Sequence, residues 1–172
     1  MIERLVKADF DAALVNDSYY NGRWDYFNEA ADLGLSLQPN SCLELGCYTL
    51  PLFKQSVTMD IDAARNPAVL HNAETTPWPF SDKQFDLFVA LQVWEHLGVK
   101  QIEAFKEVRR VAKTAILSFP LMWLNVPTSD FHHGITMEKI ADWTLNVAPK
   151  KVVVMPPWTR KRAIYMFDFR SS

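Results

Sequence analysis

The chain has 172 residues, of which 49% are hydrophobic and 13% aromatic, enough for one domain with a sizeable core. Its formal net charge of -2 and its sequence pI of about 6.1 argue against a protein built around contacts to a nucleic-acid backbone. No apolar stretch approaches the roughly 18 residues that span a bilayer, and the first residues lack the apolar core of a signal peptide. We therefore expect a single soluble domain without a nucleic-acid or membrane partner.

The cysteines and the basic residues carry two further expectations. Cys42 and Cys47 lie too close in sequence to stabilise a small secreted fold through a disulfide bond, which favours a reduced, cytoplasmic protein. Arg160-Lys161-Arg162 is the only dense basic run in the chain. We interpret it as a solvated loop or strand end rather than as a phosphate-binding patch.

The first predicted element is a helix over residues 17–33. Asp17 or Ser18 can cap its start, aromatic residues and alanine recur at helical spacing, and Gly34 can end it. Two interpretations stay open. The helix packs on the core, or it forms a lid over a ligand, with one of the adjacent tyrosines Tyr19 and Tyr20 reaching inward.

Five short apolar runs are predicted to be strands, at residues 41–46, 56–60, 68–71, 85–90 and 115–119. The two longest are apolar almost continuously, which is typical of parallel strands that are covered on both faces. A clear amphipathic helix over residues 102–112 separates them.

The end of the chain predicts one more helix and two strands. The helix covers residues 136–147 and has Thr136 as its N-cap. The strands at 151–155 and 163–169 are joined by a Pro156-Pro157 turn and pair antiparallel, because no long helix fits between them. The predicted fold class is α/β: an open, mostly parallel twisted sheet of about seven strands, with helices on both faces and an antiparallel C-terminal edge hairpin.

Ligands of an open parallel sheet bind beyond the carboxyl ends of its strands. The residues at these predicted ends are Glu44, Gly46, Cys47 and Tyr48, then Asp60, Ile61 and Asp62, then Asn72 and Ala73, and finally Leu91 and Gln92. An acid after the second strand suits the hydroxyls of a ribose, and a glycine after the first lets the backbone approach a ligand. The side-chain oxygen of Asn72 suits an adenine amino group.

The stretch from Leu43 to Leu97 resembles the class I S-adenosylmethionine (SAM)-dependent methyltransferases, in particular the small branch with the generic methyltransferase domain. The matching pieces are Leu43-Glu44-Leu45-Gly46-Cys47, Met59-Asp60-Ile61-Asp62, the run from Thr76 to Leu87 with its Pro79-Phe80-Ser81-Asp82, and Trp94-Glu95-His96-Leu97. The segments from Phe105 to Pro120 and from Phe131 to Thr136 resemble later parts of the family. Any one piece is weak, but their common order is specific.

The resemblance implies a Rossmann-like fold, SAM as cofactor and S-adenosylhomocysteine (SAH) as product. The implied cofactor-binding residues are Glu44, Gly46, Cys47 and Tyr48 at the methionine end, Asp60 at the ribose with Ile61 beside it and Asp62 as the alternative acid, Asn72 and Ala73 at the adenine, and Leu91 and Gln92 on the far side. Residues 1–172 then divide into an N-terminal helical cap (1–40), a cofactor-binding half (41–120) and a substrate-side half (121–172).

The loop after the first strand departs from the family pattern. Tyr48 and Leu50 stand where the family has its second and third glycines, and Tyr48 can fill the space of the methionine moiety. Only thirteen residues separate Gly46 from Asp60, too few for the usual first helix. We expect at most one helical turn there, starting at Pro51. The anchor for the cofactor carboxylate, normally the loop N–H groups and the helix N-terminus, is the part most affected.

Methyl transfer requires mainly that the acceptor is aligned, and it needs a base only where the acceptor must lose a proton. His132 and His133 are the candidate bases, followed by His96, which is otherwise a structural residue at a helix start. Trp123 and Trp94 flank an acceptor pocket or belong to the core. We predict substrate-binding roles for Trp123, His132 and His133, assign no catalytic residue, and find no zinc-ligand spacing for a metal site.

The sequence leaves two functional classes. A SAM-dependent methyltransferase that acts on a small-molecule or saccharide-type acceptor is favoured by the retained Glu44, Gly46 and Asp60. A catalytically inactive relative that serves as a binding or scaffolding module is favoured by Tyr48 and Leu50. A homodimer or a protein partner stays open in both cases.

Overall fold

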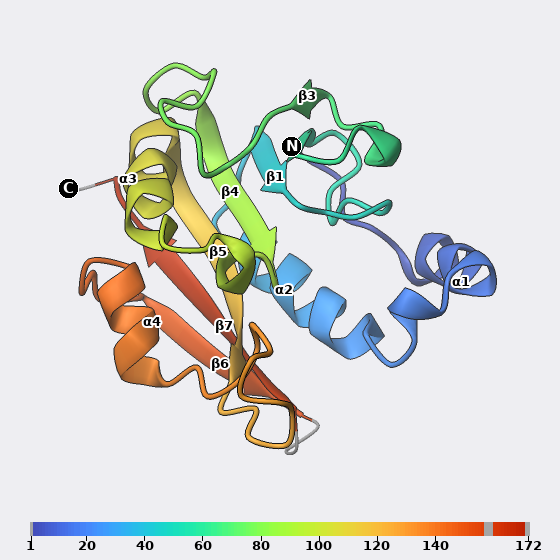
Figure 1. Cartoon of the computed structure of the whole chain (residues 1–172). Coiled ribbons are helices and arrows are strands. Elements are labelled where there is room, and N and C mark those ends of the chain that lie inside the picture. Colours follow the sequence, from blue (N-terminus) through green and yellow to red (C-terminus); the bar gives the residue numbers. More distant parts are fainter. Residues whose placement is uncertain (1, 157–159, 171–172) are drawn as a thin grey trace.

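A seven-stranded sheet runs through the computed structural model, which describes residues 2–156 and 160–170 (Figure 1). The strands are β1 (Cys42–Leu45), β2 (Val57–Asp60), β3 (Val69–Leu70), β4 (Phe85–Leu91), β5 (Ala112–Leu121), β6 (Lys151–Met155) and β7 (Lys161–Asp168). The α-helices are α1 (Lys7–Asn16), α2 (Trp24–Ser36), α3 (Gln101–Val111) and α4 (Met137–Trp143). Three short 3-10 helices are η1 (Ser18–Tyr20), η2 (Ala63–Arg65) and η3 (Trp94–His96).

The strands follow the order β3-β2-β1-β4-β5-β7-β6. The five strands from β3 to β5 pair in parallel, and β7 pairs antiparallel with both β5 and β6. This arrangement confirms the predicted Rossmann-like sheet with its antiparallel C-terminal hairpin. The strand order reverses between β1 and β4, so the carboxyl ends of these two strands border the place where such sheets bind ligands.

Alternate side chains of the central strands belong to two separate cores. On β5, Leu117 and Phe119 pack in the core that contains residues of α3 and α4, whereas Ile116 packs in the core that contains residues of α1 and α2. Figure 1 shows α3 and α4 on one side of the sheet and α2 on the other. Because both faces are covered, the strands are apolar almost without interruption.

The prediction of one continuous helix over residues 17–33 is wrong, because η1 and α2 are separate helical segments there. The side chain of Asp17 caps η1 by accepting a hydrogen bond from the backbone N–H of Tyr19 at 2.8 Å. Gly22 then adopts a φ of +67°, which a glycine tolerates easily, and α2 starts two residues later. The chain therefore turns between a short 3-10 segment and the helix proper.

Gly34 does not end α2, which continues to Ser36. A Cβ atom at Gly34 would lie 2.8 Å from the ring of Phe53 and 3.2 Å from Leu87. This glycine is thus explained by close packing of α2 against the sheet and the β1–β2 connection, and not by helix termination.

The connection from β1 to β2 contains no helix, as its length predicts, but the expected helical turn at Pro51 does not form either. Residues 46–56 consist of turns and bends with one β-bridge between Phe53 and Arg4. Backbone hydrogen bonds link the N-terminal residues to this connection, for example from Lys54 N–H to the carbonyl of Glu3. Another segment of the chain therefore satisfies backbone groups that a helix would satisfy internally.

The C-terminal elements confirm most of the prediction. Thr136 caps α4 by accepting from the backbone N–H of Lys139 at 3.2 Å, but the helix ends at Trp143 and is shorter than the predicted 136–147. The two final strands pair antiparallel as expected, while Pro157 of the predicted turn lies outside the described residues. Within the described parts of the chain, no helix has the length and apolarity that a membrane crossing requires.

Candidate active site

Five of the predicted cofactor-binding residues line one hollow beyond β1, β2 and β3, which we call the strand-end hollow. They are Gly46, Asp60, Ile61, Asn72 and Ala73. The hollow has about 490 Å³ of empty space, part of it open to solvent. The carboxyl ends of neighbouring parallel strands thus converge as the sequence predicted.

Asp60 and not Asp62 faces the strand-end hollow. One oxygen of Asp60, Oδ1, accepts from the backbone N–H of Asp62 at 2.9 Å, and the other shows no hydrogen bond to the described residues. Asp62 is committed to its own turn, because it accepts from the backbone N–H of Ala64 at 2.9 Å and lies 3.3 Å from Arg65 Nε. Of the two predicted acids, Asp60 is therefore the one available to a ligand.

Two further residues of this hollow show specific geometry. The side-chain oxygen of Asn72 accepts from the backbone N–H of Glu74 at 2.9 Å, which leaves one lone pair and the amide N–H groups for a ligand. Gly46 has a φ of +65°, and a Cβ atom there would lie 2.7 Å from Val93 Cγ2. Only glycine fits at this strand end without strain.

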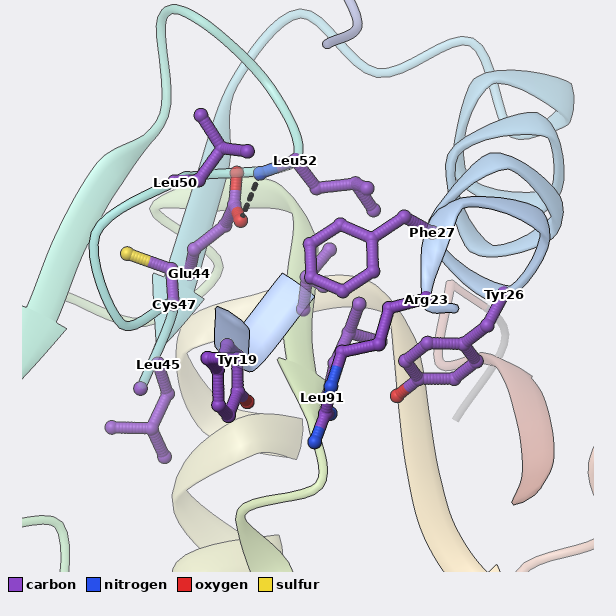
Figure 2. Close-up of a pocket in the computed structure, with 12 residues that line it drawn as sticks. Tyr19, Arg23, Tyr26, Phe27, Glu44, Leu45, Cys47, Leu50, Leu52 and Leu91 are labelled. Atoms are coloured by element: carbon purple, nitrogen blue, oxygen red, sulfur yellow. Dashed lines mark hydrogen bonds between the residues drawn. The ribbon is translucent and has the colours of Figure 1, made fainter. Parts of the chain in front are cut away.

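A second hollow, the central hollow, adjoins the first and shares Leu45 and Gly46 with it. Figure 2 shows Arg23 and Phe27 reaching into it from the start of α2, on the side opposite Leu50. Its empty space of about 360 Å³ is so divided by side chains that only about 20 Å³ admits the centre of a water molecule. That is room for about one water. The central hollow is therefore filled by its own lining.

Glu44 binds the chain itself in the central hollow. Its Oε2 accepts from the backbone N–H of Leu52 at 2.7 Å (Figure 2). Its Oε1 accepts from the backbone N–H of Phe53 at 2.8 Å. Burial raises the pKa of this carboxyl to about 7. Since no helix follows β1, the carboxylate satisfies N–H groups of the segment that replaces it, and its predicted contact with a methionine moiety stays a prediction.

A stack of aromatic and guanidinium groups covers the edge of the central hollow. The rings of Tyr19 and Tyr48 stack at 4.4 Å, with the Arg23 guanidinium 4.0 Å from the Tyr19 ring and the Arg65 guanidinium 3.7 Å from the Tyr48 ring. Tyr48 holds a φ of +60°, a conformation that favours glycine. Tyr19 lines the central hollow, whereas Tyr20 is fully buried, and a lid role for this segment stays a prediction.

The remaining predicted cofactor residues divide between two hollows. Cys47 and Leu91 line the central hollow, where burial raises the pKa of the Cys47 thiol to about 12 and keeps it protonated at neutral pH. Gln92 instead lines a third hollow, and its backbone N–H donates to Ser118 Oγ at 3.0 Å.

This third hollow, the arginine hollow, contains three cationic side chains. It is lined by Tyr19, Arg23, Gln92, His96, Trp123, Val126, Asp130, His132, Arg160 and Arg162. Its empty space is about 810 Å³, partly open to solvent. It shares Tyr19 and Arg23 with the central hollow and His96 with the strand-end hollow, so the three hollows adjoin one another.

Two of the three predicted substrate-binding residues, Trp123 and His132, line the arginine hollow. His133 does not. Its Nδ1 lies 3.0 Å from the carbonyl oxygen of Val126, and its side chain lines a separate hollow. Trp94 is a core residue with 1% of its surface exposed. Neighbouring residues on a loop point in different directions, and sequence alone could not separate the two histidines.

His132 is held on three sides. Its Nδ1 donates to Asp130 Oδ1 at 2.5 Å, its ring stacks on Trp123 at 5.0 Å, and its Nε2 lies 3.7 Å from Glu95 Oε1. Glu95 is buried, neither of its carboxyl oxygens has a hydrogen-bond partner among the described residues, and burial raises its pKa to about 8. With His96, these side chains bring three potential metal-ligand atoms within 4.8 Å of one another, a grouping that spacing along the sequence does not reveal.

The interpretation of Arg160-Lys161-Arg162 as a solvated strand end is wrong for Arg162. That residue lies at the start of β7 and is only 9% exposed. The missed signal is the period of two along a strand, which places Arg160 and Arg162 on one face and Lys161 on the other. Arg23 was also missed, because nothing in the sequence indicates that the start of α2 faces the start of β7.

Comparisons with known proteins agree with this geometry. Residues 41–115 match the family model described as a methyltransferase domain. No curated protein sequence matches the chain. Among solved structures, the chain is similar to the N-methyltransferase NodS from Bradyrhizobium japonicum WM9 in complex with SAH, with a TM-score of 0.67 and 14% identity over 94% of this chain and 96% of that one.

Two more solved structures share the fold. A SAM-dependent methyltransferase from Aquifex aeolicus has a TM-score of 0.63 and 14% identity, over 95% of this chain and all of that one. The 16S rRNA methylase RmtB has a TM-score of 0.58 and 16% identity, over 94% of this chain and 69% of that one. Residues 41–115 thus match a methyltransferase domain, and the chain as a whole has the fold of the class I SAM-dependent methyltransferases.

Proposed function

We propose that this protein is a SAM-dependent methyltransferase that binds the adenosyl part of SAM in the strand-end hollow and a small acceptor in the arginine hollow. The observation that carries the proposal is the convergence of Gly46, Asp60, Asn72 and Ala73 in one hollow at the point where the strand order reverses. When bound, SAM supplies an activated methyl group, and the protein contributes binding and alignment.

The strand-end hollow has the groups that an adenosyl moiety needs. Asp60 has an oxygen free to accept from ribose hydroxyls, and Gly46 lets the backbone come close. Asn72 offers both donors and a remaining lone pair to a base. The known SAH complex of a protein with the same fold supports SAM as the cofactor and SAH as the product.

The methionine moiety has no room in the central hollow as it stands. The side chains that occupy this space include Tyr19, which belongs to the stack with Tyr48 and not to the sheet. We infer that the segment with Tyr19 moves aside when the cofactor binds. Arg23 is the only cation in the lining and would hold the methionine carboxylate in place of the missing helix N-terminus.

For acceptors that must lose a proton, His132 is the base that the geometry favours over His133. Its Nδ1 donates to Asp130, so its Nε2 is the nitrogen left to accept a proton at the arginine hollow. His133 lines a different hollow.

The test is calorimetry of the wild-type protein with SAM and with SAH. We expect micromolar binding that Asp60→Ala weakens by at least about 10-fold, since the ribose loses a charged hydrogen-bond acceptor. Asp62→Ala is the matched control and should retain the affinity, because Asp62 faces its own turn. Equal losses in both variants would contradict the assignment of the ribose to Asp60.

One observation favours the second candidate, a non-catalytic binding or scaffolding module. The central hollow is filled, and Glu44 is already bound by the backbone of the segment after β1. If neither SAM nor SAH binds at millimolar concentration, the module is the better explanation.

A further inference from the structure

The three arginines of the arginine hollow come from two distant parts of the chain. Glu95 and Asp130 are near enough to interact with their charges but form no ion pair with them. Arg23 precedes α2, whereas Arg160 immediately precedes β7 and Arg162 is the second residue of that strand. Across the described residues, no carboxylate oxygen lies within 4.0 Å of a side-chain nitrogen of any of them. The only acid in the lining, Asp130, is bound to His132. The hollow therefore carries an excess of positive charge.

Arg162 shows that this charge is built into the fold. It is 91% buried, and its Nε has no hydrogen-bond partner in the described parts of the chain. Its guanidinium lies 5.4 Å from the Tyr26 ring and 5.5 Å from the Trp123 ring, contacts that stabilise a cation without occupying its N–H groups. A buried cation with unused donors is unfavourable unless a ligand supplies the acceptor.

The neighbouring cations make this cost larger. Burial and the charges of Arg23 and Arg160 all lower the pKa of Arg162. The Arg160 guanidinium also lies 5.5 Å from the Trp123 ring and lines the same hollow. Trp123 is itself fixed, because its Nε1 donates to the carbonyl of Lys161 at 2.6 Å. An anion placed between the arginines would relieve their repulsion and use their free donors.

We propose that the arginine hollow is an anion subsite and that the methyl acceptor carries a carboxylate or phosphate group, which Arg160 and Arg162 bind. This inference rests on the proposed methyltransferase function, since it assigns the chemical class of that function's acceptor. Planar guanidinium groups bind both anions through paired N–H donors. The anionic group does not react, and it orients the rest of the acceptor toward His132 and Gln92, which line the same hollow.

Calorimetry at low salt with inorganic phosphate, with acetate and with acetamide tests the subsite. Acetamide is the neutral counterpart of acetate. We expect at least one anion to bind and acetamide not to bind. Arg160→Gln and Arg162→Gln should each weaken anion binding by about 10-fold to 100-fold, because each removes a charged hydrogen-bond donor. The anion that binds more tightly identifies the group carried by the acceptor.

Two controls keep the result decisive. Lys106→Gln removes one positive charge from an exposed position on α3 and should leave anion binding unchanged. Arg160 is exposed, so Arg160→Gln tests the subsite even if Arg162→Gln fails to fold. The proposal is overturned if neither anion binds, if acetamide binds as well as acetate, or if the arginine variants bind anions like the wild type.

Titration of the same variants with SAH separates the two proposals. We expect Arg160→Gln to bind SAH like the wild type, because Arg160 lines only the arginine hollow among the three adjoining hollows. If the wild-type protein does not bind SAH, the proposed methyltransferase function is overturned. Anion binding that depends on Arg160 would still show the subsite in that case.

Discussion

Two buried glutamates lie near the ends of the adjacent strands β1 and β4, and their surroundings differ sharply. Glu44 lies in β1, and Glu95 lies in η3, the 3-10 helix that follows β4. Glu44 accepts hydrogen bonds from two backbone N–H groups, at 2.7 and 2.8 Å. Glu95 has no hydrogen-bond partner for either carboxyl oxygen among the described residues, and its nearest charged contact is His132 Nε2 at 3.7 Å. Burial raises the pKa of both, to about 7 for Glu44 and about 8 for Glu95.

The two strand ends therefore have different roles. The end of β1 is a closed structural unit, in which Glu44 replaces the helix that the short connection cannot form. The end of β4 carries an unsatisfied acid beside an unsatisfied cluster of cations, and unsatisfied buried polar groups are retained mainly where a ligand will use them. We therefore expect substitutions at β1 to affect folding and substitutions at β4 to affect binding and pH dependence.

The largest expected effect is that of Glu44→Ala. Removal of the carboxylate leaves the buried N–H groups of Leu52 and Phe53 without acceptors, which should lower the free energy of unfolding by about 4 kcal/mol. Urea denaturation measures the loss. Glu44→Gln retains one oxygen acceptor and should lower the free energy of unfolding by less. Equal losses in the two variants would show that the carboxylate does not stabilise the fold through these hydrogen bonds.

Gly46→Ala tests the contact between the two strand ends. Its new Cβ atom would lie 2.7 Å from Val93 Cγ2, and the residue would keep a positive φ. We expect the free energy of unfolding to fall by about 3 kcal/mol, partly from the steric clash and partly from the strained backbone. The double variant Gly46→Ala/Val93→Ala should recover the steric part of this loss and not the backbone part. Thermal and urea denaturation of the single and double variants measure both parts, and a double variant no more stable than Gly46→Ala would contradict the clash.

Glu95→Gln tests the acid at β4 through pH. The pKa of Glu95 is about 8 in the folded state against the usual 4.5, so the folded state holds a proton that the unfolded state releases. Stability from this group is fully present below pH 4.5 and is lost as pH rises to about 8. Glutamine cannot ionise, so the variant should gain up to about 1.4 kcal/mol per pH unit relative to the wild type as the pH rises from 5 toward 8.

Urea denaturation of the wild type and of Glu95→Gln across this pH range gives the comparison. Glu44 titrates in both proteins, so its contribution cancels in the difference between them. Stability curves that stay parallel from pH 5 to pH 8 would show that Glu95 has an ordinary pKa.

The smallest expected effect is that of Tyr48→Gly on stability. The change relieves a positive φ but removes the stack with Tyr19, so the free energy of unfolding should change by less than about 1 kcal/mol. The affinity for SAH should rise by about 5-fold, because the lid segment opens more easily. Calorimetry measures this, with Tyr48→Phe as the control that keeps the ring. An unchanged SAH affinity in Tyr48→Gly would show that the Tyr48 ring does not hold the lid segment closed.

The sequence predicted the strand-end hollow well because parallel strands impose it. Once 41–46 and 56–60 are neighbouring parallel strands, Gly46 and Asp60 must emerge at the same edge of the sheet. The choice of Asp60 over Asp62 was not predictable, because it depends on hydrogen bonds within the turn after β2. His132 and His133 were likewise separated only by the path of their loop.

The α/β fold, its mostly parallel sheet and the acid and glycine at the strand ends could all be predicted from the amino-acid sequence, since they follow from local apolar runs and from the geometry of parallel pairing. That Arg23, Arg160 and Arg162 share one hollow, and that Glu95 lies buried beside His132, became visible in the folded structure alone. Contacts between segments distant in sequence carry no local pattern, because they arise from how α2 and β7 pack across the sheet.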